Sequence, residues 1–250
     1  MTRSARWAAW AVILAFFLWS AWATEVSLSR SIDGVPFVLD FLRRMLPPDP
    51  SVLGHALRGA TQTLQIAIVG TGIAAILALP VGFLAARNVS PPWLFYAARS
   101  ILNMFRAVDT LVYALIFVAA VGLGPFPGVL AVVAYTATVL GKLYSEAIES
   151  IDPGPVEAVA ATGASQLQLL RWGILPQLVP QFLSFTLYRF ETNIRAAAIL
   201  GFVGAGGIGF YIQTYLRMLN YPAASTVLLV LIALVMVVDF ASSRLRARLV

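Results

Sequence analysis

The residues that could carry chemistry in this sequence are few. The chain has no cysteine and a single histidine, His55, which excludes disulfides, thiolate nucleophiles and cysteine or paired-histidine metal sites. We interpret His55 as a surface or interfacial side chain. An intramembrane enzyme is disfavoured for the same reasons, and the sequence has no G-x-S-x-G motif. The remaining candidates are charged side chains inside apolar segments, where a charge usually faces a cavity or a partner.

Six polar residues inside predicted spans form a candidate translocation path: Arg106, Asp109, Arg189, Glu191, Asn193 and Arg195. The first two of them, Arg106 and Asp109, are three residues apart at the start of one span. This spacing suits an ion pair between them as well as it suits a role in the path.

The other four lie in a later span. Glu191 and Arg195 are spaced i,i+4, which favours an ion pair. Arg189 and Asn193 share a different helix face and have no such internal partner. Asp239, near the inner end of the last span, is expected to reach the interface or a terminal arginine.

The elements that must position these residues are membrane helices. The chain is 60% hydrophobic and 11% charged, and its mean hydropathy is +0.86. Soluble domains average about 45–50% apolar and about 25% charged. The composition therefore disfavours a soluble enzyme, a disordered chain and a coiled coil. We attribute the net charge of +6 to cytoplasmic loops rather than to binding of nucleic acid.

We predict an all-α integral membrane protein with about six spans, each needing roughly 20 apolar residues. The predicted spans cover residues 7–23, 64–86, 104–121, 129–143, 178–200 and 224–240. Residues 93–103 are predicted to form a lead-in to the third span. The first span contains Ala21-Trp22-Ala23, a signal-cleavage pattern, but its apolar run exceeds the about 7–15 residues of a signal peptide. We favour an uncleaved helix.

Arginines near the spans predict that both termini are cytoplasmic. The inner stretches would hold Arg3, Arg6, Arg87, Lys142, Arg171, Arg244, Arg246 and Arg248. Residues 1–60 are predicted to form the first span and an extracytoplasmic segment, in which 35–46 is an amphipathic helix. Residues 61–250 are predicted to form the membrane core.

A polar-rich segment, 144–177, follows the fourth span. Asp152 or Gly154 can cap a short helix over 155–162, with Pro155 in its first turn. Gly163 can end this helix with positive φ.

Ser165 can cap a second short helix, 166–172, which Gly173 is expected to end before Pro176 opens the next span. Helices this short are unstable alone in water. They therefore pack either against the protein's own inner surface or into a groove of a cytoplasmic partner.

This segment resembles the EAA loop, EAA-x3-G-x9-I-x-L-P, of permease subunits in binding-protein-dependent ABC importers. The matching positions are Glu157, Ala158, Val159, Gly163, Leu175 and Pro176. Val159 stands in place of the third alanine, and Gly173 stands at the usual isoleucine position, with Ile174 one residue later. The resemblance implies that Glu157, Ala158 and Gly163 lie in a cytoplasmic coupling helix.

Segments 151–165, 172–177, 188–197 and 202–209 resemble the phosphonate/phosphite branch of this family. That resemblance implies a bacterial inner membrane protein that imports a phosphorus oxyanion by alternating access. It also implies a second copy of the chain, an extracytoplasmic binding protein and two ATPase subunits that bind ATP and magnesium. The alternatives are a permease for methionine or another small solute, or a stand-alone secondary transporter.

For a phosphorus oxyanion, arginine supplies charge and directed donors. We therefore hypothesise that Arg189, with Asn193 and Arg106, attracts the anion. Glu191 would keep it from binding too tightly for release.

Two nucleotide-like motifs are interpreted as decoys. Gly204, Gly206, Gly207 and Gly209 fit G-x-G-x-x-G, but the position 20 residues beyond the motif is Leu229, within an apolar span, instead of an acid. We interpret these glycines as a helix break in a cavity-lining segment. Gly141-Lys142 lacks the rest of a P-loop. The chain is therefore expected to hold no cofactor of its own, and ATP hydrolysis would belong to another subunit.

Overall fold

The computed structural model describes residues 3–247, and every regular element within them is a helix. The chain divides into two compact units, Met1–Leu46 and Pro47–Val250. Arg248, one of the predicted inner arginines, lies outside the described residues. The predicted all-α class is confirmed.

The first unit contains α1 (Arg3–Ala23) and α2 (Leu28–Arg44). The Ser27 side chain caps α2 by accepting a hydrogen bond from the Arg30 backbone N–H at 3.4 Å. The helix thus begins well before the predicted amphipathic segment 35–46 and accommodates Pro36 in its interior.

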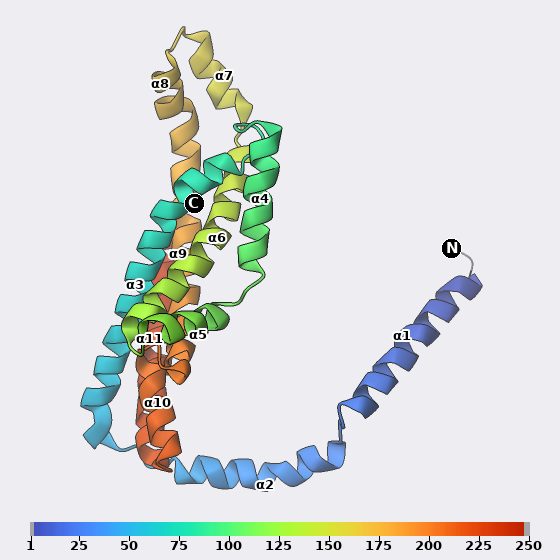
Figure 1. Cartoon of the computed structure of the whole chain (residues 1–250), viewed down its shortest axis with the longest axis vertical. Coiled ribbons are helices and arrows are strands. Elements are labelled where there is room, and N and C mark those ends of the chain that lie inside the picture. The colour runs from blue at the N-terminus through green and yellow to red at the C-terminus, as the bar shows by residue number, and fades with distance from the viewer. Residues whose placement is uncertain (1–2, 248–250) are drawn as a thin grey trace. The chain divides into compact units, whose positions relative to one another are not determined.

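The second unit holds the remaining elements (Figure 1). They are η1 (Pro50–Val52), α3 (Leu53–Leu84), α4 (Pro92–Arg106), α5 (Thr110–Val121), α6 (Pro125–Glu149), α7 (Pro153–Ala161), α8 (Gln166–Leu169), the π-helical turn η2 (Leu170–Ile174), α9 (Leu175–Leu200), η3 (Gly201–Val203), α10 (Ile208–Arg217) and α11 (Tyr221–Arg246).

Three helical stretches among the described residues are long and apolar enough to cross a membrane: Pro50–Leu84, Pro125–Glu149 and Tyr221–Arg246. The count rises to five if two bent helix pairs, α4 with α5 and α8–η3 with α10, are each one span. In the first unit, Ala9–Ala23 is a shorter apolar stretch. The count of six spans stays a prediction.

The predicted continuous span 104–121 is wrong. A break after α4 separates it from α5, and the two helices are bent by 81°. Asp109 causes the restart because its carboxylate accepts a hydrogen bond from the Leu111 backbone N–H at 2.8 Å and so caps α5. The Tyr113 hydroxyl donates to the Phe105 carbonyl at 2.7 Å, which satisfies an acceptor at the end of α4.

Small residues bring α3 and α6 together. An added Cβ at Gly70 would lie 2.6 Å from Val132 Cγ1, and one at Gly82 would lie 2.8 Å from Tyr144 Cβ. Close backbone approach through small residues is the usual basis of helix packing in membranes. Most large side chains of α3 are exposed, such as Ile76 with 69% exposure, and Ile66 is the buried exception.

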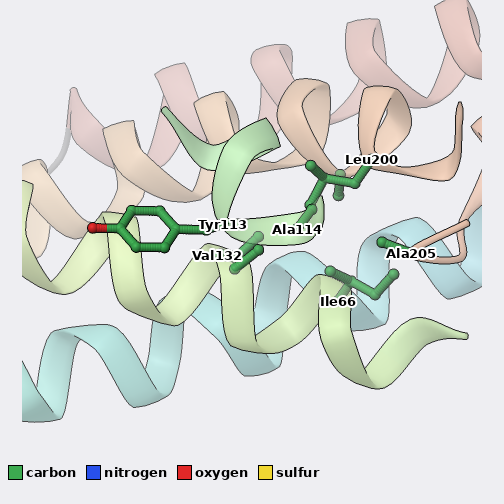
Figure 2. Packing of buried hydrophobic residues seen from close by; sticks show 8 residues of the cluster. Ile66, Tyr113, Ala114, Val132, Leu200 and Ala205 are labelled. Atoms are coloured by element: carbon green, nitrogen blue, oxygen red, sulfur yellow. The ribbon is translucent and has the colours of Figure 1, made fainter. Parts of the chain in front are cut away.

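One apolar cluster joins α3, α5, α6 and α9 (Figure 2). Its buried members are Ile66, Tyr113, Ala114, Ala131, Val132, Ala197, Leu200 and Ala205. They come from α3, α5, α6, α9 and the segment after η3. This cluster fixes α9 against α3 and α6.

Candidate functional site

A buried polar cluster joins three helices of the second unit. Asn193 of α9 is 1% exposed, and its Nδ2 donates a hydrogen bond to Thr71 Oγ1 of α3 at 2.8 Å. Its Oδ1 accepts from Thr136 Oγ1 of α6 at 3.1 Å and from Arg189 Nη2 at 3.2 Å. The structure therefore brings Arg189 and Asn193 together, as their shared helix face predicts.

Arg189 is a buried cation that pairs with no carboxylate among the described residues. It is 7% exposed, and its Nε has no hydrogen-bond partner within the same part of the chain. Its guanidinium lies 5.3 Å from the centroid of the Tyr135 ring, where the negative face of the ring gives partial compensation. A buried donor without an acceptor carries a large desolvation penalty. An approaching anion would relieve it.

Glu191 and Arg195 form ion pairs with each other and with side chains of α11. They form the expected pair at 2.8 Å, and Glu191 also accepts from Arg246 of α11 at 2.7 Å. Arg195 reaches Asp239 of α11 at 3.3 Å, so Asp239 pairs with an arginine of α9 and, among the described terminal arginines, with neither Arg244 nor Arg246. Within the described part of the chain, no hydrogen bond or ion pair joins Glu191 to Arg189. These charges tie α9 to α11, and Glu191 already has two cationic partners.

Arg106 and Asp109 are not paired within the described residues. The Asp109 carboxylate is used in capping α5. Arg106 is the last residue of α4 and is half-buried. Neither residue has a hydrogen bond or ion pair with Arg189 in the described part of the chain.

The segment after α6 forms a helical hairpin at one end of the unit (Figure 1). Asp152 caps α7 by accepting from the Gly154 N–H at 3.0 Å, so Pro153 takes the first helical position that we predicted for Pro155, which lies two residues further on in the first turn. Gly163 has φ of +75°, a conformation that favours glycine. The Ser165 backbone N–H donates to the Gln168 side chain at 2.8 Å, which completes a capping box at α8.

The hairpin encloses an open groove of about 610 Å³. Ala158, Val159 and Gly163 line one side, and Gln168 and Trp172 line the other. Large apolar side chains are exposed around it, with Leu167 at 74% and Trp172 at 64%. Exposed apolar surface of this kind marks an interaction site.

Three further motif residues do not line the groove. Glu157 is exposed and unpaired among the described residues, and it does not line the groove. Leu175 and Pro176 form the first turn of α9.

The expected helix end at Gly173 is wrong. Gly173 lies inside η2, which continues into α9 without a break. Its role is close packing, because an added Cβ would lie 3.2 Å from Val156 Cα of α7.

The glycine segment after η3 breaks the helical chain. Gly204, Gly206 and Gly207 have φ of +83°, +78° and +82°. The Gly207 N–H donates to Gln62 Oε1 of α3 at 2.7 Å, which satisfies a donor at the start of α10. Gly209 lies within α10, where an added Cβ would collide with the Ala198 carbonyl. An opening of about 350 Å³ lies beside Gly204 and Gly206.

Sequence reasoning missed three residues that complete these sites. Thr71 and Thr136 hold Asn193, but a threonine in an apolar helix gives no signal of a partner on another helix. Gln177 links α7 to α9. Its position directly after the Leu175-Pro176 motif was the available signal.

The family described as binding-protein-dependent transport system inner membrane component matches residues 78–250. The putative phosphite transport system permease protein HtxC of Stutzerimonas stutzeri is 41% identical over 248 residues, which cover 98% of this chain and 88% of that protein. The phosphite transport system permease protein PtxC of the same organism is 41% identical over 238 residues, with coverage of 94% and 86%. The phosphate-import permease protein PhnE of Mycolicibacterium smegmatis is 41% identical over 220 residues, which are 86% of this chain and 41% of that protein.

A solved structure has the same fold. An inward-facing conformation of the MetNI methionine ABC transporter aligns with a TM-score of 0.68 and 23% identity, over 81% of this chain and 99% of the matched chain. At this identity the likeness concerns the fold and not the solute.

Proposed function

The chain belongs to the family of inner membrane components of binding-protein-dependent transport systems, and on that premise we propose that it passes a phosphorus oxyanion, such as phosphite or a phosphonate, into the cytoplasm. The observation that carries the proposal is Arg189, a buried cation to which the described structure gives no carboxylate partner, in a chain 41% identical to phosphite permeases. The relatives are transport components rather than enzymes, so chemistry on the solute is not part of the proposal.

Arg189 would contact the anion during passage. Its Nε has no acceptor, while Asn193 and the Tyr135 ring hold the rest of the guanidinium in position. A single cation held by neutral groups attracts an oxyanion without the multiple charged contacts of a tight binding site. In this proposal release does not depend on Glu191, which pairs with Arg195 and with Arg246 of α11.

The hairpin of α7 and α8 would couple transport to ATP hydrolysis. Its groove and its exposed Leu167 and Trp172 offer apolar surface to a cytoplasmic subunit. Two ATPase subunits with bound ATP and magnesium would close on the hairpins of two copies of this chain. Their closure would open the spans outward to an extracytoplasmic binding protein, and hydrolysis would reset them. With the predicted six spans, this arrangement would place both termini of the chain in the cytoplasm.

Uptake by the reconstituted complex tests the substrate class. Proteoliposomes with permease, ATPase and binding protein should take up phosphite only when hydrolysable ATP is enclosed on the side of the ATPase. Phosphonates should compete with phosphite for uptake. Uptake of methionine instead would favour the alternative permease of the same architecture. Uptake by this chain alone under an ion gradient would favour a secondary transporter and contradict the proposal.

Variants of Arg189 test the anion contact. Arg189→Met should lower uptake at least tenfold, since a charge-assisted hydrogen bond contributes about 1.5–3 kcal/mol. Arg189→Lys should retain part of the activity, because it keeps the charge but not the directed donors. Arg195→Met is the matched control on the same helix, and it should not alter substrate preference. Equal uptake by Arg189→Met and the wild type would refute the contact.

Variants of the hairpin test coupling. Glu157→Lys combined with Gly163→Trp should abolish copurification with the ATPase and its stimulation by substrate. Glu146→Lys is the matched charge reversal, at an exposed glutamate of α6 outside the groove, and should leave both intact. Unchanged copurification and stimulation in the double variant would count decisively against docking at this hairpin.

A further inference from the structure

The Gln177 side chain, in the first turn of α9, makes three hydrogen bonds, two of which reach Asp152 at the base of α7. Its Oε1 accepts a hydrogen bond from the Asp152 backbone N–H at 3.0 Å. Its Nε2 donates to the Asp152 carbonyl at 3.2 Å and to the Gly173 carbonyl at 2.8 Å. One amide thus pairs with both backbone groups of the residue that caps α7, and with the turn that leads into α9.

Apolar packing closes the same joint from a second side. The absent Cβ of Gly173 lets Val156 of α7 approach directly, with only 3.2 Å to its Cα from the position of such a Cβ. Ile151, just before α7, packs with Ile174 and Leu178 in a cluster at this end of the unit. The base of α7 is therefore held to α9 by polar and apolar contacts together.

The π-helical turn η2 sets the geometry of this joint. It connects α8 to α9 without a gap, so residues 166–200 form one continuous helical element. A π-turn accommodates an extra residue, which changes the facing of the helix beyond it. Here the turn contains Gly173 and presents it to α7.

We propose that Gln177 is the positioning residue that locks α7 to α9, so that displacement of α7 by a docked ATPase moves α9 and with it Arg189. Gln177 and Arg189 are 12 residues apart on this helix, or about 18 Å at 1.5 Å per residue. Because Asn193 holds α3 and α6 through Thr71 and Thr136, movement of α9 would also change those contacts. This inference rests on the proposed function of the α7–α8 hairpin.

The first test measures the phosphite imported per ATP hydrolysed in the reconstituted complex. Gln177→Leu keeps the volume and removes all three hydrogen bonds, and we expect roughly a tenfold fall in this ratio, the effect of about one net hydrogen bond. Gln177→Glu keeps only the acceptor for the Asp152 N–H and should give an intermediate ratio. Copurification with the ATPase should be unchanged in both.

Asn88→Ala is the matched control. The Asn88 side chain donates to the Ile148 carbonyl at 2.9 Å, a similar side-chain-to-backbone bond outside the α7–α9 joint. Its ratio should equal that of the wild type. A merely structural role for Gln177 would lower the yield of the complex without lowering the ratio, and that result would overturn the inference.

The second test needs no transport. The chain has no cysteine, so spin labels at Ala161→Cys on α7 and Val179→Cys on α9 label only this pair. We expect a narrow distance distribution in the full-length permease and a broad one after Gln177→Leu or Gln177→Glu. An equally narrow distribution in the variants would overturn the inference. Failure of wild-type uptake would instead reject the proposed function, and the label distances would still decide the joint.

Discussion

The Asn193 side chain links α9 to α3 and α6 by hydrogen bonds. Asn193→Leu therefore tests how far the packing of these three helices depends on one residue. Leucine has the same number and branching of side-chain heavy atoms but no hydrogen-bonding atoms. The substitution would leave Thr71 and Thr136 without their interhelical partner and Arg189 without its only hydrogen bond in the described structure.

The cost follows from the number and type of bonds lost. Hydrogen bonds between membrane helices contribute about 0.6 kcal/mol each on average. The bond from the charged Arg189 contributes about 1.5–3 kcal/mol. We therefore expect Asn193→Leu to lower the free energy of unfolding by about 3 kcal/mol. Pairing it with Arg189→Met should recover part of this loss, because no buried charge is then left without a partner.

Unfolding in mixed micelles, followed by circular dichroism, measures both effects. Asn103→Leu is the matched control, because Asn103 is exposed on α4, and its stability should be close to that of the wild type. A loss below about 0.5 kcal/mol for Asn193→Leu would refute the reasoning on hydrogen bonds. A double variant that loses the sum of both single effects would refute the reasoning on the buried charge.

Three further predictions concern stability and use the same unfolding assay unless stated. Gly70→Ala should lower the free energy of unfolding by about 1–3 kcal/mol, because its Cβ would lie 2.6 Å from a valine side chain of α6. Gly72→Ala is the control, because its Cβ would meet nothing within 4 Å, and it should be neutral or stabilising. Equal effects of the two substitutions would contradict the packing argument. Glu191→Gln should destabilise the chain, because two arginines lose their shared carboxylate partner. Glu146→Gln should change the stability little, because Glu146 forms an exposed ion pair with Lys142 at 3.7 Å. A larger loss of stability for Glu146→Gln than for Glu191→Gln would count against the link between α9 and α11. Asp152→Ala should speed amide hydrogen exchange in α7, because it removes a helix cap that contributes about 1 kcal/mol. Asp152→Asn should keep the slow exchange of the wild type, because asparagine also caps helices. Fast exchange in both variants would show that capping is not the cause of protection in α7.

Local chemistry made much of this fold predictable from the sequence. The apolar runs predict the helices because lipid demands internally satisfied backbone groups. Gly163 adopts the positive φ expected at a helix end, and Ser165 starts the next helix as its residue type suggests. The i,i+4 spacing of Glu191 and Arg195 likewise predicts their ion pair.

Choices between competing partners were not predictable. Asp109 had both an arginine three residues before it and a backbone N–H two residues after it, and only the structure selects the N–H. Glu191 meets Arg246, 55 residues away, through a helix contact that no local pattern encodes. Gly173 has the residue type of a helix end, but its neighbour Val156 makes it a packing residue.

The small-residue face of α3 has a consequence for how this sequence can change over generations. In a soluble protein, large apolar side chains fill the core and the surface tolerates variation. Here the buried face holds mostly small residues, such as Gly59, Gly70 and Gly82, with Ile66 as a large exception, and most bulky residues lie outside. A saturation library of α3 should therefore show intolerance that recurs along one face, with any side-chain enlargement rejected there. The opposite face should accept exchanges among apolar residues, so drift along this helix is confined to the side that neighbouring lipid covers.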